Sequence, residues 1–170
     1  MSVESIVIAT DLNKTFKAEQ KGLGDVQALQ GINMQIKAGQ LTALVGPDGA
    51  GKTTFLRLIA GLYKPTAGSL EVLGMDVAKD PQSVQDRISY MPQKFGLYED
   101  LSIQENLDLY ADLHGVPMNV RKERFARLLK ITDLARFTER PAGKLSGGMK
   151  QKLGLACTLV RSPELLLLDE

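Results

Sequence analysis

Cysteine and histidine are nearly absent from this chain of 170 residues, which has one of each, Cys157 and His114. A single cysteine cannot form an internal disulfide or a cysteine-based metal cluster, which fits a reducing cytosol. Its apolar neighbours, Leu155 and Ala156, predict a buried core thiol and not a reactive one. His114 follows a helix-forming segment, so we expect it in the last helical turn, near the negative end of the helix dipole.

Long apolar runs and a dominant sign of charge are also missing. No stretch approaches the length of a membrane span and no signal peptide opens the chain, so any membrane association is expected to come through a partner. The 21 basic and 20 acidic residues leave a net charge of +1, which gives no overall field to attract nucleic acid. An apolar fraction of 44% and a charged fraction of 24% are typical of a soluble globular domain.

One glycine-rich stretch carries the strongest chemical signal. Residues 46–54 match in full the phosphate-binding loop pattern, which is Gly, four residues, then Gly-Lys-Ser/Thr. The preceding segment, Leu41 to Val45, is apolar and β-prone and predicts a buried strand, whereas 55–60 predict a helix that stops at Gly61. An ordinary glycine turn is the alternative, but the full match in a strand-loop-helix setting favours nucleotide binding.

Each part of this loop has a physical role in binding an anion. The glycines allow a tight turn that brings backbone N–H groups close to a phosphate, and the following helix adds the positive end of its dipole. Lys52 supplies a charge for the β- and γ-phosphates, the Thr53 hydroxyl can ligate Mg²⁺, and Thr54 is placed to add a hydroxyl contact. The residues predicted to bind the nucleotide here are Gly46, Pro47, Asp48, Gly49, Ala50, Gly51, Lys52, Thr53 and Thr54.

The other patterns predict strands first and helices later. Strands are expected at 5–9, 28–36, 69–73 and 88–91, with 12–16 following the first, a flexible loop at 17–24 and a short helix at 82–87. Amphipathic helices are expected at 102–114, with Ser102 and Glu105 as a capping box, and at 120–131. A further helix is expected from about 145 to 161.

Basic residues of the helix at 120–131 pose a choice between two interpretations. Arg121, Lys122, Arg124 and Arg127 could form a nucleic-acid patch. No interleaved aromatics or glycine loop accompany them, so a solvated helix face is favoured and no nucleic-acid partner is expected.

The final residues predict an interrupted core. Leu165 to Leu168 is apolar on both faces and predicts a central parallel strand, which leads directly into Asp169 and Glu170. A natural domain seldom stops where a buried strand delivers two carboxylates. The sequence therefore predicts a fragment that lacks the remainder of its core.

Four motifs resemble those of the ATP-binding cassette (ABC) family and follow one another along the chain in the family's order. Beside the phosphate-binding loop, Leu145-Ser146-Gly147-Gly148 resembles the family's signature motif, and Gln93, after a strand, resembles its Q-loop glutamine. Leu165 to Asp169 resembles the Walker B strand with its Mg²⁺ aspartate. The resemblance covers essentially the whole chain.

The resemblance implies an α/β fold, a P-loop NTPase (RecA-like) core with an antiparallel β subdomain and an inserted α-helical subdomain, incomplete after the Walker B strand. It implies one partial ATP-binding domain over 1–170, made of a β subdomain with the P-loop core (1–93), a helical subdomain with the signature (94–161) and the Walker B strand (162–170).

The resemblance also implies roles for individual residues toward ATP and Mg²⁺. Glu170 falls on the catalytic glutamate, which orients or deprotonates the attacking water, and Asp169 holds Mg²⁺ with Thr53. Gln93 can reach the metal or that water. Phe16 falls on the aromatic that stacks on adenine, with a core aromatic as the alternative.

In the family, the signature of one subunit closes over the ATP held by another, in a head-to-tail dimer. Ser146, Gly147 and Gly148 therefore imply a second ABC ATPase domain as partner, and closure converts binding energy into movement. The D-loop and the switch histidine lie beyond Glu170 in the family, so the 170-residue chain alone is expected to bind ATP poorly and to hydrolyse almost none.

Residues around Gln93 and around the signature narrow the resemblance to bacterial ABC-2-type exporters, including multidrug exporter ATPases. Those residues are 91–98, 148–151 and 153–156, and Asp48 is similar to members with two cassettes in one chain. The implied function is the ATPase subunit of an exporter on the cytoplasmic face of the membrane, in which 93–112 dock a permease. Phe95, Leu97 and Tyr98 are candidates for that contact or are core residues.

Two alternatives stay open. ABC-type DNA-repair ATPases insert long coiled coils or zinc modules between the loop and the signature, whereas this interval is short and holds no cysteine. A soluble paired-cassette ATPase acting in translation would need a second cassette and no permease. Substrate identity is not encoded, because the permease selects the cargo.

Overall fold

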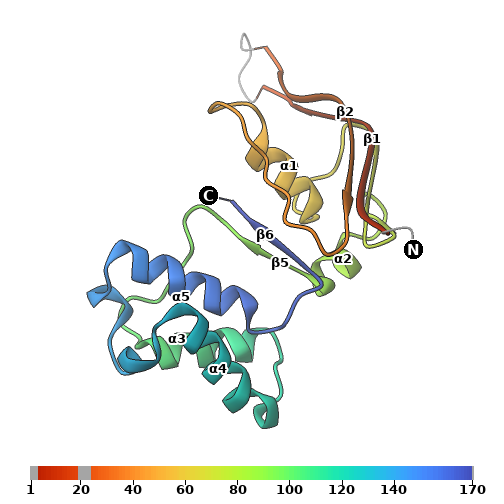
Figure 1. Cartoon of the computed structure of the whole chain (residues 1–170). Coiled ribbons are helices and arrows are strands. Elements are labelled where there is room, and N and C mark those ends of the chain that lie inside the picture. Colours follow the sequence, from red (N-terminus) through yellow and green to blue (C-terminus); the bar gives the residue numbers. More distant parts are fainter. Residues whose placement is uncertain (1–3, 19–23, 170) are drawn as a thin grey trace. The chain divides into compact units, whose positions relative to one another are not determined.

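The computed structural model describes residues 4–18 and 24–169, and the chain divides into two compact units, Met1–Ile88 and Ser89–Glu170. The strands of the described part are β1 (Ser5–Phe16), β2 (Val26–Lys37), β3 (Ala67–Val72), β4 (Met75–Asp76), β5 (Ile88–Met91) and β6 (Leu165–Leu168) (Figure 1). Its helices are α1 (Lys52–Ile59), α2 (Pro81–Arg87), α3 (Ile103–Leu113), α4 (Met118–Thr132) and α5 (Gly147–Leu159), with short 3-10 helices η1 (Ala135–Phe137) and η2 (Ala142–Lys144). None of the described helices is long and apolar enough to cross a membrane.

An antiparallel sheet in the order β2-β1-β3-β4 forms the body of the first unit. Val7 pairs with Val72 and Ala9 with Leu70, so these buried side chains share one face of the sheet. Helix α1 packs against β2 and β3 and buries Phe55, among others. The strands predicted at 28–36 and 69–73 and the helix predicted at 82–87 are confirmed.

Strand β1 unites the two predicted segments 5–9 and 12–16 through an irregularity. Its pairing register with β2 shifts between Ala9 and Leu12, and Asp11 has a left-handed φ of 44°. The Asp11 N–H leaves the ladder and donates to the side-chain oxygen of Asn33 at 2.9 Å. A β-bulge of this kind bends the strand without ending it, so one strand contains both segments.

The predicted buried strand at Leu41–Val45 is wrong. These residues form no strand, and Leu41 and Val45 are 99% and 93% exposed. A strand needs a neighbour to exchange backbone hydrogen bonds, and the sheet of the first unit does not include this segment. The apolar composition of this segment favours a strand, but a strand also needs a neighbouring strand with which to pair.

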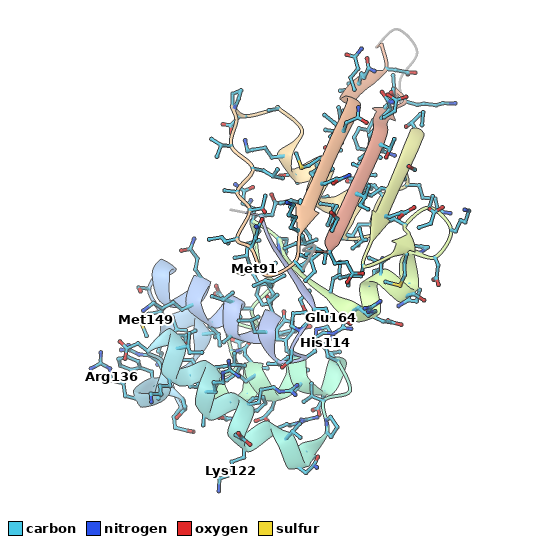
Figure 2. The ribbon with its side chains drawn as sticks, turned by 45° about the vertical axis from the view of Figure 1, so that its right-hand side comes forward. Met91, His114, Lys122, Arg136, Met149 and Glu164 are labelled. Atoms are coloured by element: carbon cyan, nitrogen blue, oxygen red, sulfur yellow. The ribbon has the colours of Figure 1, made fainter. Side chains whose placement is uncertain are left out.

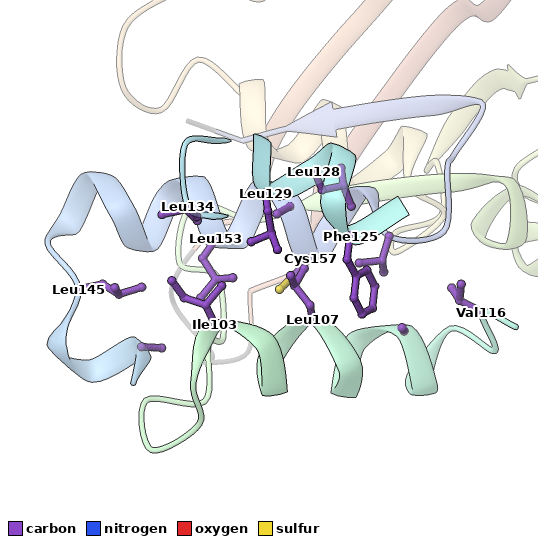
Figure 3. Close-up of a cluster of buried hydrophobic side chains, with 14 residues drawn as sticks. Ile103, Leu107, Val116, Phe125, Leu128, Leu129, Leu134, Leu145, Leu153 and Cys157 are labelled. Carbon is purple, nitrogen blue, oxygen red and sulfur yellow. The ribbon is translucent and has the colours of Figure 1, made fainter. Parts of the chain in front are cut away.

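Helices α3, α4 and α5 enclose the core of the second unit (Figure 3). Ile103 and Leu107 of α3, Phe125 of α4 and Leu153 of α5 contribute to one buried cluster. The predicted capping box is confirmed, because Glu105 N–H donates to Ser102 Oγ at 3.1 Å and Ser102 N–H donates to Glu105 Oε2 at 2.7 Å. His114 is the C-cap of α3, at the predicted end of that helix.

Strand β6 is present where predicted and pairs with β5. The two strands run side by side in the same direction (Figure 1). The prediction that this strand is buried on both faces is wrong for Leu168, which is 49% exposed, although Leu167 is buried. A central strand needs neighbours on both edges, and within the described residues this sheet has β5 as the single neighbour of β6.

Two of the basic residues on α4 make hydrogen bonds to other segments of the chain. Arg121 is buried, donates to the Val116 carbonyl at 2.8 Å and pairs with Asp112 at 2.7 Å. Arg124 donates to the Val160 carbonyl at 2.6 Å. The prediction of a solvated face is therefore wrong for these two arginines, which donate to the carbonyls of Val116, between α3 and α4, and of Val160, the C-cap of α5.

Cys157 is fully buried in the helical core, as predicted. Burial raises the pKa of its thiol to about 12, so the reactive thiolate is scarce at neutral pH. We expect Ellman's reagent to leave Cys157 unmodified in the native protein at pH 8 and to react fully in denaturant. Rapid native labelling would contradict this buried placement.

Candidate functional site

The loop at 46–51 has the backbone shape that an anion cradle requires. Gly49 and Gly51 have left-handed φ values of 77° and 87°, and Ala50 N–H closes a turn onto the Pro47 carbonyl at 3.2 Å. Gly51 is also held close to β2, because a Cβ there would lie 2.6 Å from the Ala28 carbonyl oxygen. A side chain at position 51 would therefore displace the loop.

Lys52 opens helix α1 and directs its charge back across the loop. Its Nζ donates to the carbonyl oxygens of Gly46 at 2.8 Å and Pro47 at 2.9 Å. Thr53 and Thr54 follow in the first turn, and no acidic residue lies in that turn. A lysine ammonium and the free N–H groups of a helix start favour an anion such as phosphate.

Phe16 ends β1 and is partly buried. Its ring lies 5.4 Å from that of Tyr63 at an interplanar angle of 77°, an edge-to-face contact. The Lys14 ammonium lies 4.9 Å from the Phe16 ring centre and 5.5 Å from the Tyr63 ring centre. Phe16 therefore belongs to an aromatic cluster with a cation, and its ring is not sealed in the core.

A second helix start lies in the other unit. Ser146 is the N-cap of α5, and its Oγ accepts from the Met149 N–H at 3.3 Å. Gly147 and Gly148 are exposed, and a Cβ at either would meet nothing within 4 Å. Figure 2 shows Met149 in this first turn of α5. The arrangement presents open backbone N–H groups, as in an anion nest.

Asp169 follows β6 directly and is buried, with 4% of the residue exposed. Its N–H donates to the Met91 carbonyl at 3.0 Å, and its Oδ2 accepts from the Tyr90 hydroxyl at 2.7 Å. Tyr90 is a functional candidate that the sequence analysis missed. Its position on the strand leading to Gln93 was the available signal, because neighbouring strand ends converge. Glu170 lies outside the described residues.

Gln93 follows β5 and is exposed. It borders a cavity of about 180 Å³ within the second unit. The residues that line this cavity are Met91, Gln93, Phe95, Leu97, Glu99, Lys150 and Gln151. Phe95 and Leu97 pack partly against the helical core, whereas Tyr98 is 54% exposed. The Q-loop position and the start of α5 therefore share one cavity.

The predicted site residues fall into both units. The loop at 46–54 and Phe16 lie in the first unit, and Gln93, the signature and Asp169 lie in the second. The Thr53 hydroxyl of the first unit and the Asp169 carboxylate of the second are each a hard oxygen donor of the kind that Mg²⁺ prefers. The described residues hold no cluster of three or more His, Cys, Asp or Glu side chains that could bind a metal by themselves.

Comparison with known proteins agrees with these features. The profile of the family described as ABC transporter matches residues 29–170. The chain is 54% identical over 167 residues to the probable multidrug ABC transporter ATP-binding protein YbhF of Escherichia coli (strain K12), covering 98% of this chain and 28% of that protein. It is 35% identical to the bacitracin transport ATP-binding protein BcrA of Bacillus licheniformis, covering 99% of this chain and 52% of that protein. The chain therefore spans about a quarter to a half of these relatives.

Solved structures show the same fold. The structure of cbiO1 from Clostridium perfringens, part of an ABC transporter complex, superposes with a TM-score of 0.83 at 28% identity, covering 98% of this chain and 66% of that one. A dimeric ATP-binding cassette in a post-hydrolysis state with ADP and Pi superposes with a TM-score of 0.81 at 28% identity, covering 96% and 73%. The predicted fold is confirmed as an α/β cassette of the P-loop NTPase type, with an antiparallel β subdomain and a helical subdomain. The chain belongs to the ABC transporter family and forms part of an ATP-binding cassette.

Proposed function

We propose that this chain is the nucleotide-binding part of an ATPase that powers an exporter. The observation that carries the proposal is the loop at 46–51, whose left-handed glycines and inward-directed Lys52 form an anion cradle at the start of α1. ATP is the proposed nucleotide and Mg²⁺ the proposed ion. Phe16 is proposed to stack on adenine, and 46–54 to hold the phosphates.

The chain's own residues have distinct roles in this proposal. Thr53 and Asp169 would hold Mg²⁺, which would offset negative charge on the phosphates when bound. Gln93 would sense the metal or the attacking water, and Glu170 would orient that water or accept its proton. The Tyr90 hydroxyl holds the Asp169 carboxylate in one orientation, since its bond to Oδ2 is 2.7 Å long.

The nest formed by Ser146, Gly147 and Gly148 is proposed to complete the ATP site of another cassette. Open space around both glycines supports this assignment, because a second protein surface can approach the helix start without a clash. A related solved structure is described as a dimeric cassette with ADP and Pi. Two cassettes would then enclose ATP head to tail, and closure would transmit force to a permease.

Export is proposed from the names of the relatives and from one exposed segment. One relative is named a probable multidrug transporter protein and another a bacitracin transport protein. Tyr98 is more than half exposed in the segment 93–112, which is proposed to dock the permease at the cytoplasmic face of the membrane. The boundaries at 93 and 161 and the weak activity of the isolated chain stay predictions.

Affinity purification of the full-length protein from membranes and from the soluble fraction tests the exporter assignment. We expect the tagged protein to co-purify from detergent-solubilised membranes with a permease, and its ATP hydrolysis to rise when that permease is present. Recovery with ribosomes and without a membrane protein would instead support an ATPase acting in translation and would contradict the proposal.

A further inference from the structure

Glu99 contacts the chain on both sides of the signature. Its carbonyl oxygen accepts from the Gly143 N–H at 2.8 Å, shortly before Ser146. Its carboxylate Oε1 lies 2.6 Å from the Lys150 Nζ, shortly after Gly148. One residue therefore joins the segment that leads into the signature to the helix that leaves it.

The contact before the signature leaves little room for a side chain. A Cβ at Gly143 would lie 3.1 Å from the carbonyl oxygen of Glu99 and 3.4 Å from its Cβ. The Ala142 N–H also donates to the Leu101 carbonyl at 2.8 Å. The segment that leads into the signature is thereby held in register against the chain that follows Gln93.

The contact after the signature acts on the first turn of α5. Gly147 and Gly148 have no side chains, and the described structure leaves open space around the positions of their Cβ atoms. Leu145 is buried before the turn, Met149 packs partly against the helical core, and the Ser146 cap holds the backbone. Lys150 is the residue of this turn that an ion pair ties to a separate segment.

The ion pair contributes to local geometry more than to global stability. The Lys150 side chain is 32% exposed and that of Glu99 is 66% exposed, so water competes for both groups and salt screens them. A short charge-assisted hydrogen bond nevertheless fixes the direction of the groups that it joins. Removing it should therefore leave the fold intact while loosening the orientation of the nest.

We propose that Glu99 and Lys150 are positioning residues that orient the signature for closure on a nucleotide and tie it to the segment after Gln93. This inference rests on the proposed function, since it requires the signature to close on ATP. Both residues line the same cavity as Gln93, so a shift of that segment would reach the signature through this pair. Neither residue belongs to the phosphate-binding loop.

Steady-state ATP hydrolysis by the full-length protein tests the pair. We expect Glu99→Gln and Lys150→Met each to lower kcat about fivefold, while ATP binding at the loop changes by less than about twofold. The charge-reversed double variant, Glu99→Lys with Lys150→Glu, should regain most of the lost rate, because it restores the attraction. Glu123→Gln and Lys152→Met are matched controls that remove exposed charges of the same unit and should keep the wild-type rate.

Two results would overturn the inference: wild-type turnover in both single variants, or a double variant as slow as the single ones. A decrease of the same size in Glu123→Gln or Lys152→Met would also overturn it, because the effect would then come from a general change of charge. Failure of the proposed function is a separate result, since the wild-type protein would then neither bind nor hydrolyse ATP.

Discussion

Replacing Lys52 by alanine is expected to lower the ATP turnover of the full-length protein by about 100-fold or more. The Lys52 ammonium already points into the loop, where it contacts the carbonyl oxygens of Gly46 and Pro47. A phosphate bound in that loop would accept a hydrogen bond from the same ammonium. The negative charge on the phosphate oxygens shifts further in the transition state, where the ammonium stabilises it. Steady-state hydrolysis and direct ATP titration together separate the loss of binding from the loss of rate.

Lys37→Ala is the matched control for this prediction. Lys37 is an exposed lysine at the end of β2 in the same unit, so its removal changes net charge equally without touching the loop. We expect it to retain the wild-type rate. Turnover in Lys52→Ala within about threefold of wild type would show that the loop does not hold the reacting phosphates.

Replacing Gly68 by alanine is expected to lower the free energy of unfolding by about 3 kcal/mol or more. Gly68 has a φ of 79°, and a Cβ there would overlap the carbonyl group of Asp11. That carbonyl belongs to the bulge of β1, so the clash is with backbone and cannot be relieved by a rotamer change. Equilibrium unfolding in urea measures the loss.

Gly74→Ala separates steric overlap from backbone strain. Gly74 has a similar φ of 76°, but a Cβ there would meet nothing within 4 Å. The free energy of unfolding of the Gly74→Ala variant should therefore fall by only about 1 kcal/mol, the usual cost of an alanine in the left-handed conformation. Equal losses in the two variants would contradict the close approach of β3 to the bulge.

Local features of the sequence predicted local features of the structure. The capping box of Ser102 and Glu105 is confirmed because its donors and acceptors lie within one helical turn. The glycines of the loop at 46–51 likewise have the left-handed backbone expected of a tight turn, at Gly49 and Gly51. In both places the residues that decide the conformation are adjacent in the chain.

Features that depend on distant partners could not be predicted in this way. The strand expected at Leu41–Val45 has the right composition, but no neighbouring strand of its own unit pairs with it. The bond from Tyr90 to Asp169 joins residues 79 positions apart, and spacing alone does not reveal it. The sequence predicts a solvated face for Arg121, yet its side chain is buried and donates to the Val116 carbonyl, between α3 and α4.

A cryo-EM reconstruction of the full-length protein with MgATP, in a Glu170→Gln variant that we expect to hydrolyse ATP slowly, tests the central claim most directly. The account predicts ATP phosphates against Lys52 and the N–H groups of the loop at 46–51. It also predicts that Ser146 and Gly148 contact an ATP held by the loop of another cassette. Phosphates away from the loop, or a signature that touches no nucleotide in the closed state, would contradict the account.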